Sequence, residues 1–273
     1  MSMGRDGIMK QDSLKRKIKL SFLIFLYNLA IFSCSHIDSE DRLVYERRAD
    51  AYRKILIEDF TGQRCINCPN ASEEIERLHM QFGKDTIIAV AIHSGPLGFS
   101  TNNKYYGLKT EIGDEYYNHW NPDYQPIGMV NRHGLCDYTS WNAKIREEIQ
   151  KPTSIQIYGN VRLADNKIKV STEIQNNGDE LKSGLQLWIV EDNIPAFQLM
   201  PDGTMNENYL HQHVLRTAVN GVWGERIVIP SKNSLQKEYE IVLDKEWKVK
   251  DIAVVVFVCD DSGVLQVTNL NLK

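Results

Sequence analysis

Apolar positions in the first half of the chain alternate between strand-like and helix-like spacing. Residues 55–60 form a short, mostly apolar run, as expected of a strand that is buried on both faces. Apolar side chains then recur every three or four residues before Gly83, at Ala71, Ile75, Leu78 and Phe82. This spacing predicts a helix that ends at the glycine. Residues 86–92 form a second apolar run, and strand, helix and strand in this order predict a parallel βαβ unit.

Two more helices and a short strand are predicted after this unit. One helical face is formed by apolar residues spaced four apart, at Leu108, Ile112, Tyr116 and Trp120. Pro126 precedes a short apolar strand at 127–130. A closing helix is predicted by the apolar residues Trp141, Ile145 and Ile149. Residues 51–150 are therefore predicted to form an α/β domain.

The apolar period changes after Lys151-Pro152. From residue 155 onward apolar and polar positions alternate, and turn residues such as Asn176-Asn177-Gly178 separate short strands. Further strands are predicted at 185–190, 226–229, 239–243, 252–258 and 264–268. Residues 151–273 are therefore predicted to form an all-β antiparallel sandwich, immunoglobulin-like or fibronectin-like. Residues 193–220 show no regular pattern, and we expect a long irregular loop there.

The N-terminal segment has the pattern of an export signal. A basic cluster at 15–19 precedes an apolar run at 20–32, which is short for a membrane span but suits a signal peptide. The run ends at Ser33-Cys34, and this small residue before a cysteine resembles a bacterial lipobox. Residues 1–34 are therefore predicted to be a signal peptide with lipidation at Cys34; the alternative is a cleaved secretory signal with a coincidental cysteine. Residues 35–50 are polar and acidic and predict a tether.

Composition and charge narrow the classes of function. The 273-residue chain is 42% hydrophobic and 25% charged, which is ordinary for a globular protein. Its formal net charge of -4 gives no electrostatic reason to expect a nucleic-acid partner. We therefore expect partners among envelope or surface proteins, and membrane attachment through a lipid on Cys34. Because disulfides persist outside the cytoplasm, each remaining cysteine needs a redox assignment.

The strongest chemical signal is Cys65-Ile66-Asn67-Cys68 at the start of the predicted helix. Unpaired helix N–H groups and the neighbouring Arg64 would stabilise a thiolate on Cys65, which is expected to be the exposed, nucleophilic sulfur. Cys68 would then attack the mixed disulfide and release the partner. The alternative is a permanent structural disulfide in a scaffold that binds other proteins.

The sequence predicts neither a cofactor nor a metal ion. A zinc site at the cysteine pair would need two further ligands, and nothing places Cys136 or His133 close to it. His211 and His213 share a face if their segment is a strand, but two histidines alone are a weak metal signal. His93 ends the second predicted strand, where a structural role is the ordinary outcome.

The βαβ unit and its cysteine pair resemble the thioredoxin superfamily. Residues 55–60 leading to Cys65 and Cys68 are similar to that superfamily's strand and active-site turn. The resemblance implies that Asp59 is the buried carboxyl that assists proton transfer, and that Pro126 is the cis-proline beside the disulfide. Arg64 stands where the superfamily usually has tryptophan, and Ile66-Asn67 replaces its Gly-Pro, so redox potential and substrate preference cannot be carried over.

A second resemblance covers nearly the whole predicted mature chain. Its motifs lie at 58–62, 65–71, 91–95, 126–132, 187–192 and 211–216. They resemble the outer-membrane lipoprotein family named for a 28-kilodalton outer-membrane protein. This resemblance implies a lipid-anchored protein at the outer membrane, on its periplasmic face or at the cell surface, and it defines no activity.

These observations lead to two hypotheses about function. The first is thiol–disulfide exchange on envelope proteins, which needs an accessible Cys65 with a lowered pKa and a reducible disulfide. The second is a non-catalytic outer-membrane or surface lipoprotein whose disulfide is structural and whose β-sandwich binds a partner. The two differ in a measurable property, because a scaffold can keep the cysteine pair permanently oxidised.

Overall fold

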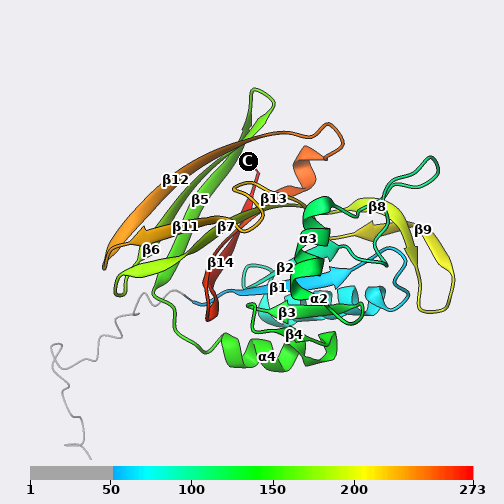
Figure 1. The fold of residues 1–273 in the computed structure, drawn as a ribbon, viewed down its shortest axis with the longest axis horizontal. Helices are drawn as coiled ribbons and strands as arrows, with labels where there is room; N and C mark the ends of the chain where they lie inside the picture. Colours follow the sequence, from blue (N-terminus) through cyan, green and yellow to red (C-terminus); the bar gives the residue numbers. More distant parts are fainter. Residues whose placement is uncertain (1–51, 273) are drawn as a thin grey trace, which may run out of the picture. The chain divides into compact units, whose positions relative to one another are not determined.

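The computed structural model describes residues 52–272, which belong to one compact unit (Figure 1). The predicted signal peptide at 1–34, the tether at 35–50 and the lipidation site Cys34 lie outside the described residues. Among the residues that are described, no helix is both long and apolar enough to cross a membrane.

The predicted βαβ unit is present. Strands β1 (Ile55–Thr61) and β2 (Ile87–His93) pair in parallel, and helix α2 (Cys68–Phe82) connects them. Every residue of both strands is buried, which explains why their sequences are apolar runs without alternation. Pro69 lies in the first turn of α2, where its missing N–H has no intrahelical partner to lose, and Gly83 with a φ of 90° ends the helix.

On its other edge β1 pairs antiparallel with β3 (Ile127–Val130), which in turn pairs with β4 (Leu135–Cys136). Helices α2 and α4 (Trp141–Glu148) pack on one face of this sheet, where Trp141 and Ile145 contact the apolar residues of β1. Helix α3 (Glu111–Trp120) packs on the opposite face through Tyr116. A short 3-10 turn at Tyr138–Ser140 precedes α4.

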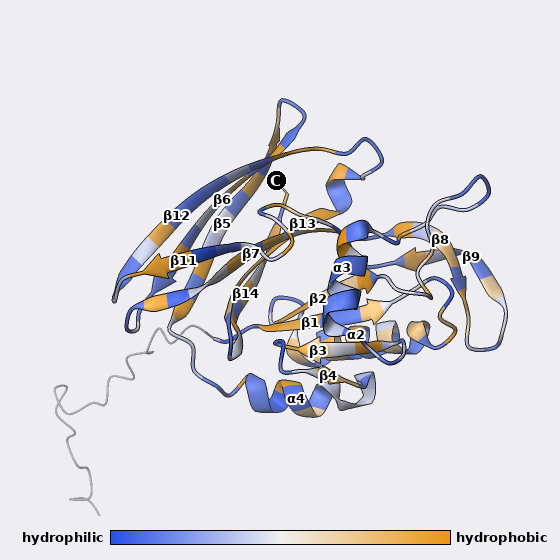
Figure 2. Ribbon diagram, viewed as in Figure 1, coloured by the Kyte–Doolittle hydropathy of each residue, from blue (hydrophilic) through white to orange (hydrophobic). Residues whose placement is uncertain are grey.

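The second half of the chain is built from antiparallel strands. A three-stranded sheet contains β5 (Ile155–Ala164), β6 (Lys167–Asn176) and β12 (Asn233–Val242). Its apolar side chains share a core with those of β7 (Leu181–Glu191), β11 (Glu225–Ile229), β13 (Ile252–Asp260) and β14 (Gly263–Asn271). Figure 2 shows β13 mostly hydrophobic and β12 mostly hydrophilic, in keeping with the greater exposure of β12. The β-rich class is confirmed, and the immunoglobulin-like or fibronectin-like subtype stays a prediction.

One sheet continues from the first half of the chain into the second. Its strand order is β14-β13-β7-β10-β2-β1-β3-β4, and a ninth strand, β11, also pairs with β7. Strand β10 (Val214–Ala218) is antiparallel to β7 and parallel to β2 through the pair Val214–Ala91. Apolar residues from both halves, including Phe60 of β1 and Phe257 of β13, belong to a common core. The division into 51–150 and 151–273 stays a prediction, and the two segments share a sheet.

The region expected to be an irregular loop contains ordered strands. Strands β8 (Ile194–Leu199) and β9 (Met205–His211) form an antiparallel hairpin, and β10 follows directly, so the prediction of a loop over 193–220 is wrong. A second 3-10 turn, Val249–Asp251, leads into β13. The β8–β9 hairpin lies beside α2 and the turn that follows β1, which makes it part of the candidate site.

Candidate functional site

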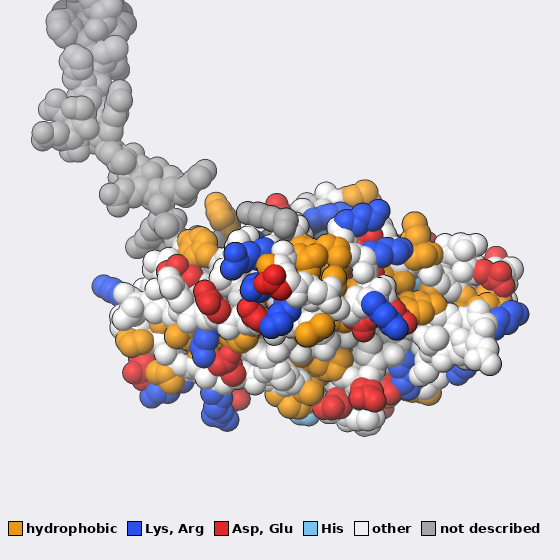
Figure 3. All heavy atoms as spheres, turned by 90° about the horizontal axis from the view of Figure 1, so that it is seen from above, with side chains coloured by type: hydrophobic (Ala, Val, Ile, Leu, Met, Phe, Trp, Pro, Cys, Tyr) orange, Lys and Arg blue, Asp and Glu red, His pale blue; other side chains and the backbone are white. Residues whose placement is uncertain are grey.

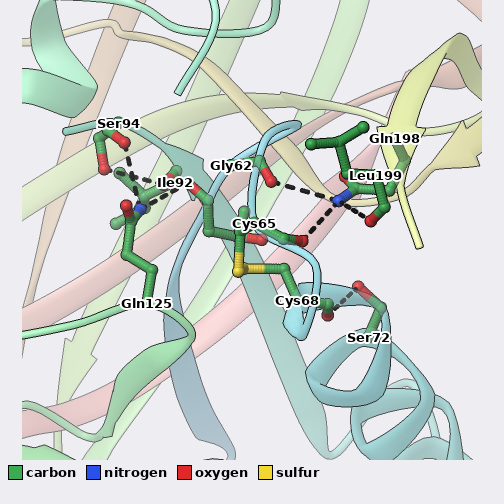
Figure 4. Close-up of a disulfide and its surroundings, with 10 residues drawn as sticks. Gly62, Cys65, Cys68, Ser72, Ile92, Ser94, Gln125, Gln198 and Leu199 are labelled. Atoms are coloured by element: carbon green, nitrogen blue, oxygen red, sulfur yellow. Dashed lines mark hydrogen bonds between the residues drawn. A yellow bond between two sulfur atoms is a disulfide. The ribbon is translucent and has the colours of Figure 1, made fainter. Parts of the chain in front are cut away.

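Cys65 and Cys68 form a disulfide between the turn after β1 and the first residue of α2 (Figure 4). The turn is closed by the Cys65 N–H, which donates to the Gly62 carbonyl at 3.0 Å. Cys65 is only 2% exposed and Cys68 only 1% exposed. The expectation that Cys65 is an exposed sulfur is therefore wrong, because another part of the chain covers this turn.

The β8–β9 hairpin provides the cover. The side-chain amide of Gln198 donates to the Cys65 carbonyl at 2.8 Å and to the Gly62 carbonyl at 3.3 Å (Figure 4). The Leu199 N–H donates to the Gln63 carbonyl at 2.9 Å. The fully buried Gln63 side chain in turn donates to the carbonyls of Tyr106 and Phe197. A network of hydrogen bonds thus fixes the hairpin over the disulfide.

Asp59 lies on β1, six residues before Cys65, and is 1% exposed. Neither of its carboxyl oxygens has a hydrogen-bond partner among residues 52–272. Burial without compensation raises the pKa of Asp59 to about 7, because an ionised carboxylate is poorly solvated there. The carboxyl therefore has a pKa suited to taking or giving a proton near neutral pH.

Pro126 follows a cis peptide bond with Gln125. The Gln125 side-chain amide donates to the carbonyls of Thr61 at 2.8 Å and Ser94 at 3.1 Å, so the loop is held at the carboxyl ends of β1 and β2 (Figure 4). Thr61 immediately precedes the turn that carries Cys65. The structure thus brings the Pro126 loop to the same end of the sheet as the disulfide.

A cavity of about 640 Å³ lies between α2, the ends of β1 and β2, and the β8–β9 hairpin. Asp59 and Cys68 both line it, as do Gln198 of the hairpin and His93 at the end of β2. Cys65 does not line this cavity. Of the four predicted site residues in the described part of the chain, the cavity therefore joins Asp59 and Cys68, while Cys65 and Pro126 lie outside its wall.

Two histidines face each other in the cavity wall. The rings of His93 and His211 are 5.1 Å apart, and both side chains are buried. Burial lowers the pKa of His93 well below its ordinary value and lowers that of His211 to about 4. Both imidazoles are therefore neutral at pH 7. His93 keeps an unpartnered Nδ1 among the described residues, so its predicted role as a satisfied structural histidine is only partly met.

A second polar group, two of whose three members line the cavity, was not predicted. Glu76 and His79 lie on neighbouring turns of α2, and His213 follows β9; their side chains converge. The signal for part of this group is the Glu-x-x-His spacing at 76–79, because residues three apart share a helix face. The contribution of His213 depends on the unpredicted hairpin. By contrast, His133 hydrogen-bonds Glu148, and Cys136 is half-buried between other apolar residues.

Charged side chains of both signs are interspersed with hydrophobic ones on the face shown in Figure 3. This mixture matches the small net charge of -4. The surface seen in this view thus carries no large field of a single sign.

Comparison with solved structures finds proteins of similar fold. HBP35 of Porphyromonas gingivalis is 15% identical in sequence, with a TM-score of 0.64, over 81% of this chain and 76% of that chain. A domain of the outer membrane lipoprotein Omp28 from Porphyromonas gingivalis is 25% identical over 44% of this chain and 91% of that chain, with a TM-score of 0.32. No curated protein matches the sequence. The likeness to HBP35 shows a shared fold.

Comparison with protein families gives an assignment. Residues 113–273, more than half of the chain, match the family described as "Outer membrane protein Omp28". This is the family that the motifs of the sequence resemble, and its description supports a location at the outer membrane. The chain belongs to the Omp28 family of outer membrane proteins.

Proposed function

We propose that this outer membrane protein carries out thiol–disulfide exchange on envelope proteins, with Cys65 and Cys68 as the redox pair of a thioredoxin-like first half. The parallel β1–α2–β2 unit, with the disulfide at the start of α2, supports this proposal. The observation that carries it is Asp59, a buried carboxyl without a hydrogen-bond partner in the described chain, in the same cavity as Cys68.

Asp59 favours catalysis because a structural disulfide gives no reason to keep such a carboxyl. Burying a polar group without a hydrogen bond costs about 1–3 kcal/mol by mutational measurement, more when the group is ionised. Groups with strongly shifted pKa values cluster at functional sites, where proton transfer requires them. A carboxyl with a pKa of about 7 can take the proton of a cysteine thiol during exchange and return it afterwards.

The proposed reaction has two displacement steps. The Cys65 thiolate of the reduced protein attacks a substrate disulfide, whose leaving sulfur takes a proton, and a mixed disulfide forms. The Cys68 thiol then gives its proton to Asp59 and attacks Cys65 Sγ, which re-forms the Cys65–Cys68 bond. The second substrate sulfur leaves and receives the proton from Asp59. The substrate gains two electrons, the pair loses two, and the reverse sequence oxidises a substrate dithiol.

The cover over Cys65 adds a step to this reaction. A substrate sulfur must reach Cys65, so the hydrogen bonds from Gln198 to the turn must open first. Opening requires no rearrangement of the nine-stranded sheet, because β8 and β9 pair only with each other within the described sheets. The hairpin therefore makes access to the redox pair conditional.

The reduction potential of the cysteine pair tests the proposal. It is measured by glutathione titration of the protein purified from membranes in detergent. A potential between about -270 and -120 mV, the range of exchange proteins, is the expected result. A potential below about -300 mV would mark a structural disulfide and end the proposal.

A pair of trapping variants assigns the sulfurs. Cys68→Ser leaves Cys65 to accumulate mixed disulfides with envelope proteins, whereas Cys65→Ser should accumulate few. Because Cys68 and not Cys65 lines the cavity, the opposite pattern would show that Cys68 is the attacking sulfur. Equal absence of trapped proteins in both variants would count against exchange altogether.

A structural disulfide is the second candidate function, and one observation favours it. Both cysteines are buried, and the Gln198 amide binds the Cys65 carbonyl, so the turn is fixed as well as covered. In this case the protein is a non-catalytic lipoprotein that binds a partner through its β-sandwich. The potential and the trapping variants decide between the two candidates.

The membrane attachment is a separate part of the proposal. We infer that a lipid on Cys34 anchors the protein to the outer membrane. Cys34→Ala should move the protein from the membrane fraction to the soluble fraction. Cys136→Ser, which changes a half-buried cysteine elsewhere, should leave it in the membrane fraction. A Cys34→Ala protein that stays membrane-bound would exclude the lipid as anchor.

A further inference from the structure

Three side chains that the proposed exchange does not use converge beside the cavity, and two of them, Glu76 and His213, line it. His79 Nδ1 lies 3.5 Å from Glu76 Oε1, and His213 Nε2 lies 3.7 Å from the same oxygen. The ligand atoms of all three residues lie within 4.8 Å of one another. Two ligands of a tetrahedral zinc ion at about 2.0–2.1 Å from the metal are about 3.3 Å apart, so small side-chain adjustments complete such a site.

The two ring nitrogens that face Glu76 have no hydrogen-bond partner in the described chain. His79 Nδ1 and His213 Nε2 are both buried, and each contacts Glu76 Oε1 without a hydrogen bond to it. The side chain of His79 is only 3% exposed, so bulk solvent does not reach it. Buried polar atoms in native proteins are almost always paired, and two orphans aimed at one carboxylate point to a ligand between them.

The opposite nitrogen of each ring is held by an acceptor. His79 Nε2 lies 3.2 Å from the Ile87 carbonyl oxygen, and His213 Nδ1 lies 3.1 Å from Asp192 Oδ1. Since a carbonyl or carboxylate oxygen can only accept, these nitrogens carry the proton in the neutral rings. In that form, which metal binding requires, the lone pairs lie on Nδ1 of His79 and Nε2 of His213. Metal-binding histidines show this arrangement, with the second nitrogen bound to a backbone carbonyl or a carboxylate.

The backbone around His213 is shaped to present its ring. His213 has a φ of 55°, in the left-handed region that residues other than glycine rarely adopt. Its N–H donates to Asp192 Oδ1 at 2.6 Å, and its carbonyl accepts from the Ala91 N–H at 2.8 Å. These bonds join His213 to Asp192, which directly follows β7, and to Ala91 of β2. On α2, the three-residue spacing puts Glu76 and His79 on the same face.

We propose that Glu76, His79 and His213 bind a divalent transition-metal ion of the zinc class. Two imidazoles and one carboxylate are a donor set that zinc sites use with a fourth position left open. Glu76 and His213 also line the cavity, so the open position faces the space that holds Asp59 and Cys68. Lys84 Nζ lies 3.7 Å from the other Glu76 oxygen, Oε2, and leaves Oε1 to the metal. The proposal goes beyond thiol–disulfide exchange and does not depend on it.

Zinc binding to the protein tests the site directly. The protein purified in detergent is stripped with a chelator and titrated with Zn²⁺ by equilibrium dialysis, with the disulfide kept oxidised. We expect about one zinc per chain. Glu76→Gln and His213→Ala should each weaken binding at least about 100-fold, and Asp192→Asn about 10–100-fold, because it acts through His213. Co²⁺ in place of Zn²⁺ should give a tetrahedral absorption spectrum that Glu76→Gln abolishes.

Two matched controls show whether the zinc is bound by these three side chains. His119→Ala removes an exposed histidine on α3 and should leave zinc binding unchanged. A Cys65→Ser/Cys68→Ser double variant should also keep its zinc, which excludes thiolate ligands and separates the site from exchange activity. Absence of stoichiometric zinc, or binding that Glu76→Gln does not weaken, would overturn the proposal. Glu76 is half-exposed, so this variant reports on binding even where His213→Ala fails to fold.

Discussion

Glu58 and Asp59 are neighbours on β1, and both carboxyl groups are buried. They point to opposite faces of the strand, and only Glu58 has a hydrogen-bond partner there among the described residues. Glu58 is 0% exposed and accepts hydrogen bonds from the Arg132 guanidinium at 3.1 Å. The guanidinium also lies over the rings of Trp188 and Phe257. Asp59, on the face toward α2, has no partner among the described residues. Equal burial therefore gives one compensated ion pair and one carboxyl with a raised pKa.

The different pairing of buried polar groups on the two faces of β1 indicates which face can take part in a reaction. On the Glu58 face the Glu58 charge has an opposite charge and the Trp188 indole N–H has a hydrogen-bond acceptor, while Trp120 Nε1 has none among the described residues. The Asp59 face contains the cavity and the unpartnered groups of Asp59, His79 and His93. Half of the unpartnered buried side-chain atoms among residues 52–272 lie in or beside this cavity, where a substrate or an ion can satisfy them.

Removing the compensated charge should have the largest effect on stability. Glu58→Ala leaves the Arg132 guanidinium buried and unpaired, which should lower the free energy of unfolding by about 3–5 kcal/mol. Urea unfolding at neutral pH measures the change. Glu180→Ala, which breaks an exposed pair with Lys182, is the control and should have a much smaller effect. Equal effects of the two variants would show that the buried pair does not hold the Glu58 face together.

Asp59→Asn should act in the opposite direction and depend on pH. The folded-state pKa of about 7 lies above the ordinary value of 3.8, so the wild-type protein loses stability as pH rises from about 4 to about 7. A difference of about three pKa units corresponds to about 4 kcal/mol, lost fully above the folded-state pKa. The amide that replaces the carboxyl carries no charge, so unfolding free energies at about pH 4 and pH 8 should differ less in the variant. Identical pH dependence in both proteins would disprove the raised pKa.

Tyr116→Phe tests whether the Glu58 face depends on its hydrogen bonds. The Tyr116 hydroxyl accepts from Trp188 Nε1 at 2.8 Å and donates to the Val222 carbonyl. Removing it leaves both partners unpaired, and we expect a loss of about 1–3 kcal/mol in urea unfolding. The exposed Tyr124 offers the control Tyr124→Phe, which should change little. A negligible loss in Tyr116→Phe would show that this face tolerates unpaired groups as well.

Gln198→Ala should have the smallest effect, and it is a change in rate. The variant removes the amide that binds the carbonyls of Cys65 and Gly62, so the hairpin should open more readily. A net loss of about 1 kcal/mol from these two hydrogen bonds corresponds to about 5-fold faster reduction of the disulfide by dithiothreitol. Asn208→Ala, at an exposed position on the same hairpin, should not change the rate. An unchanged rate in Gln198→Ala would mean that the hairpin does not limit access.

Local patterns predicted the βαβ unit and placed the cysteine pair at the start of its helix. The apolar runs at 55–60 and 86–92 correspond to β1 and β2, and the helical spacing ending at Gly83 corresponds to α2. These elements are predictable because each depends on the spacing of apolar residues that are close together in the sequence. The two strands are also buried on both faces, which gives them continuous apolar runs. The opposite orientations of Glu58 and Asp59 follow from the strand period as well. Helix α3 was predicted from Leu108 but begins at Glu111, where the Thr110 side chain caps it.

The cover and the three-residue cluster could not be predicted in the same way. Pro201-Asp202-Gly203 was an available signal for the β8–β9 turn, since this tripeptide favours a tight turn. Polar residues along β9 hid the strand pattern, because this hairpin faces solvent along much of its length. The meeting of His213 with Glu76 depends on where the hairpin returns to the sheet, and no local pattern encodes that position.

The pairing of β10 with β2 determines which fragments of the chain can fold without the rest. A fragment that ends near residue 150 would retain β1 and β2 but lose β10, β13 and β14, and with them Phe257 and the other apolar residues that cover Phe60. Its outermost strand, β2, would then expose unpaired backbone groups beside an uncovered apolar face. Such an edge recruits further copies of itself. We therefore expect the half that contains the disulfide to aggregate when it is expressed alone, and a soluble product to need the strands from the far end of the sequence.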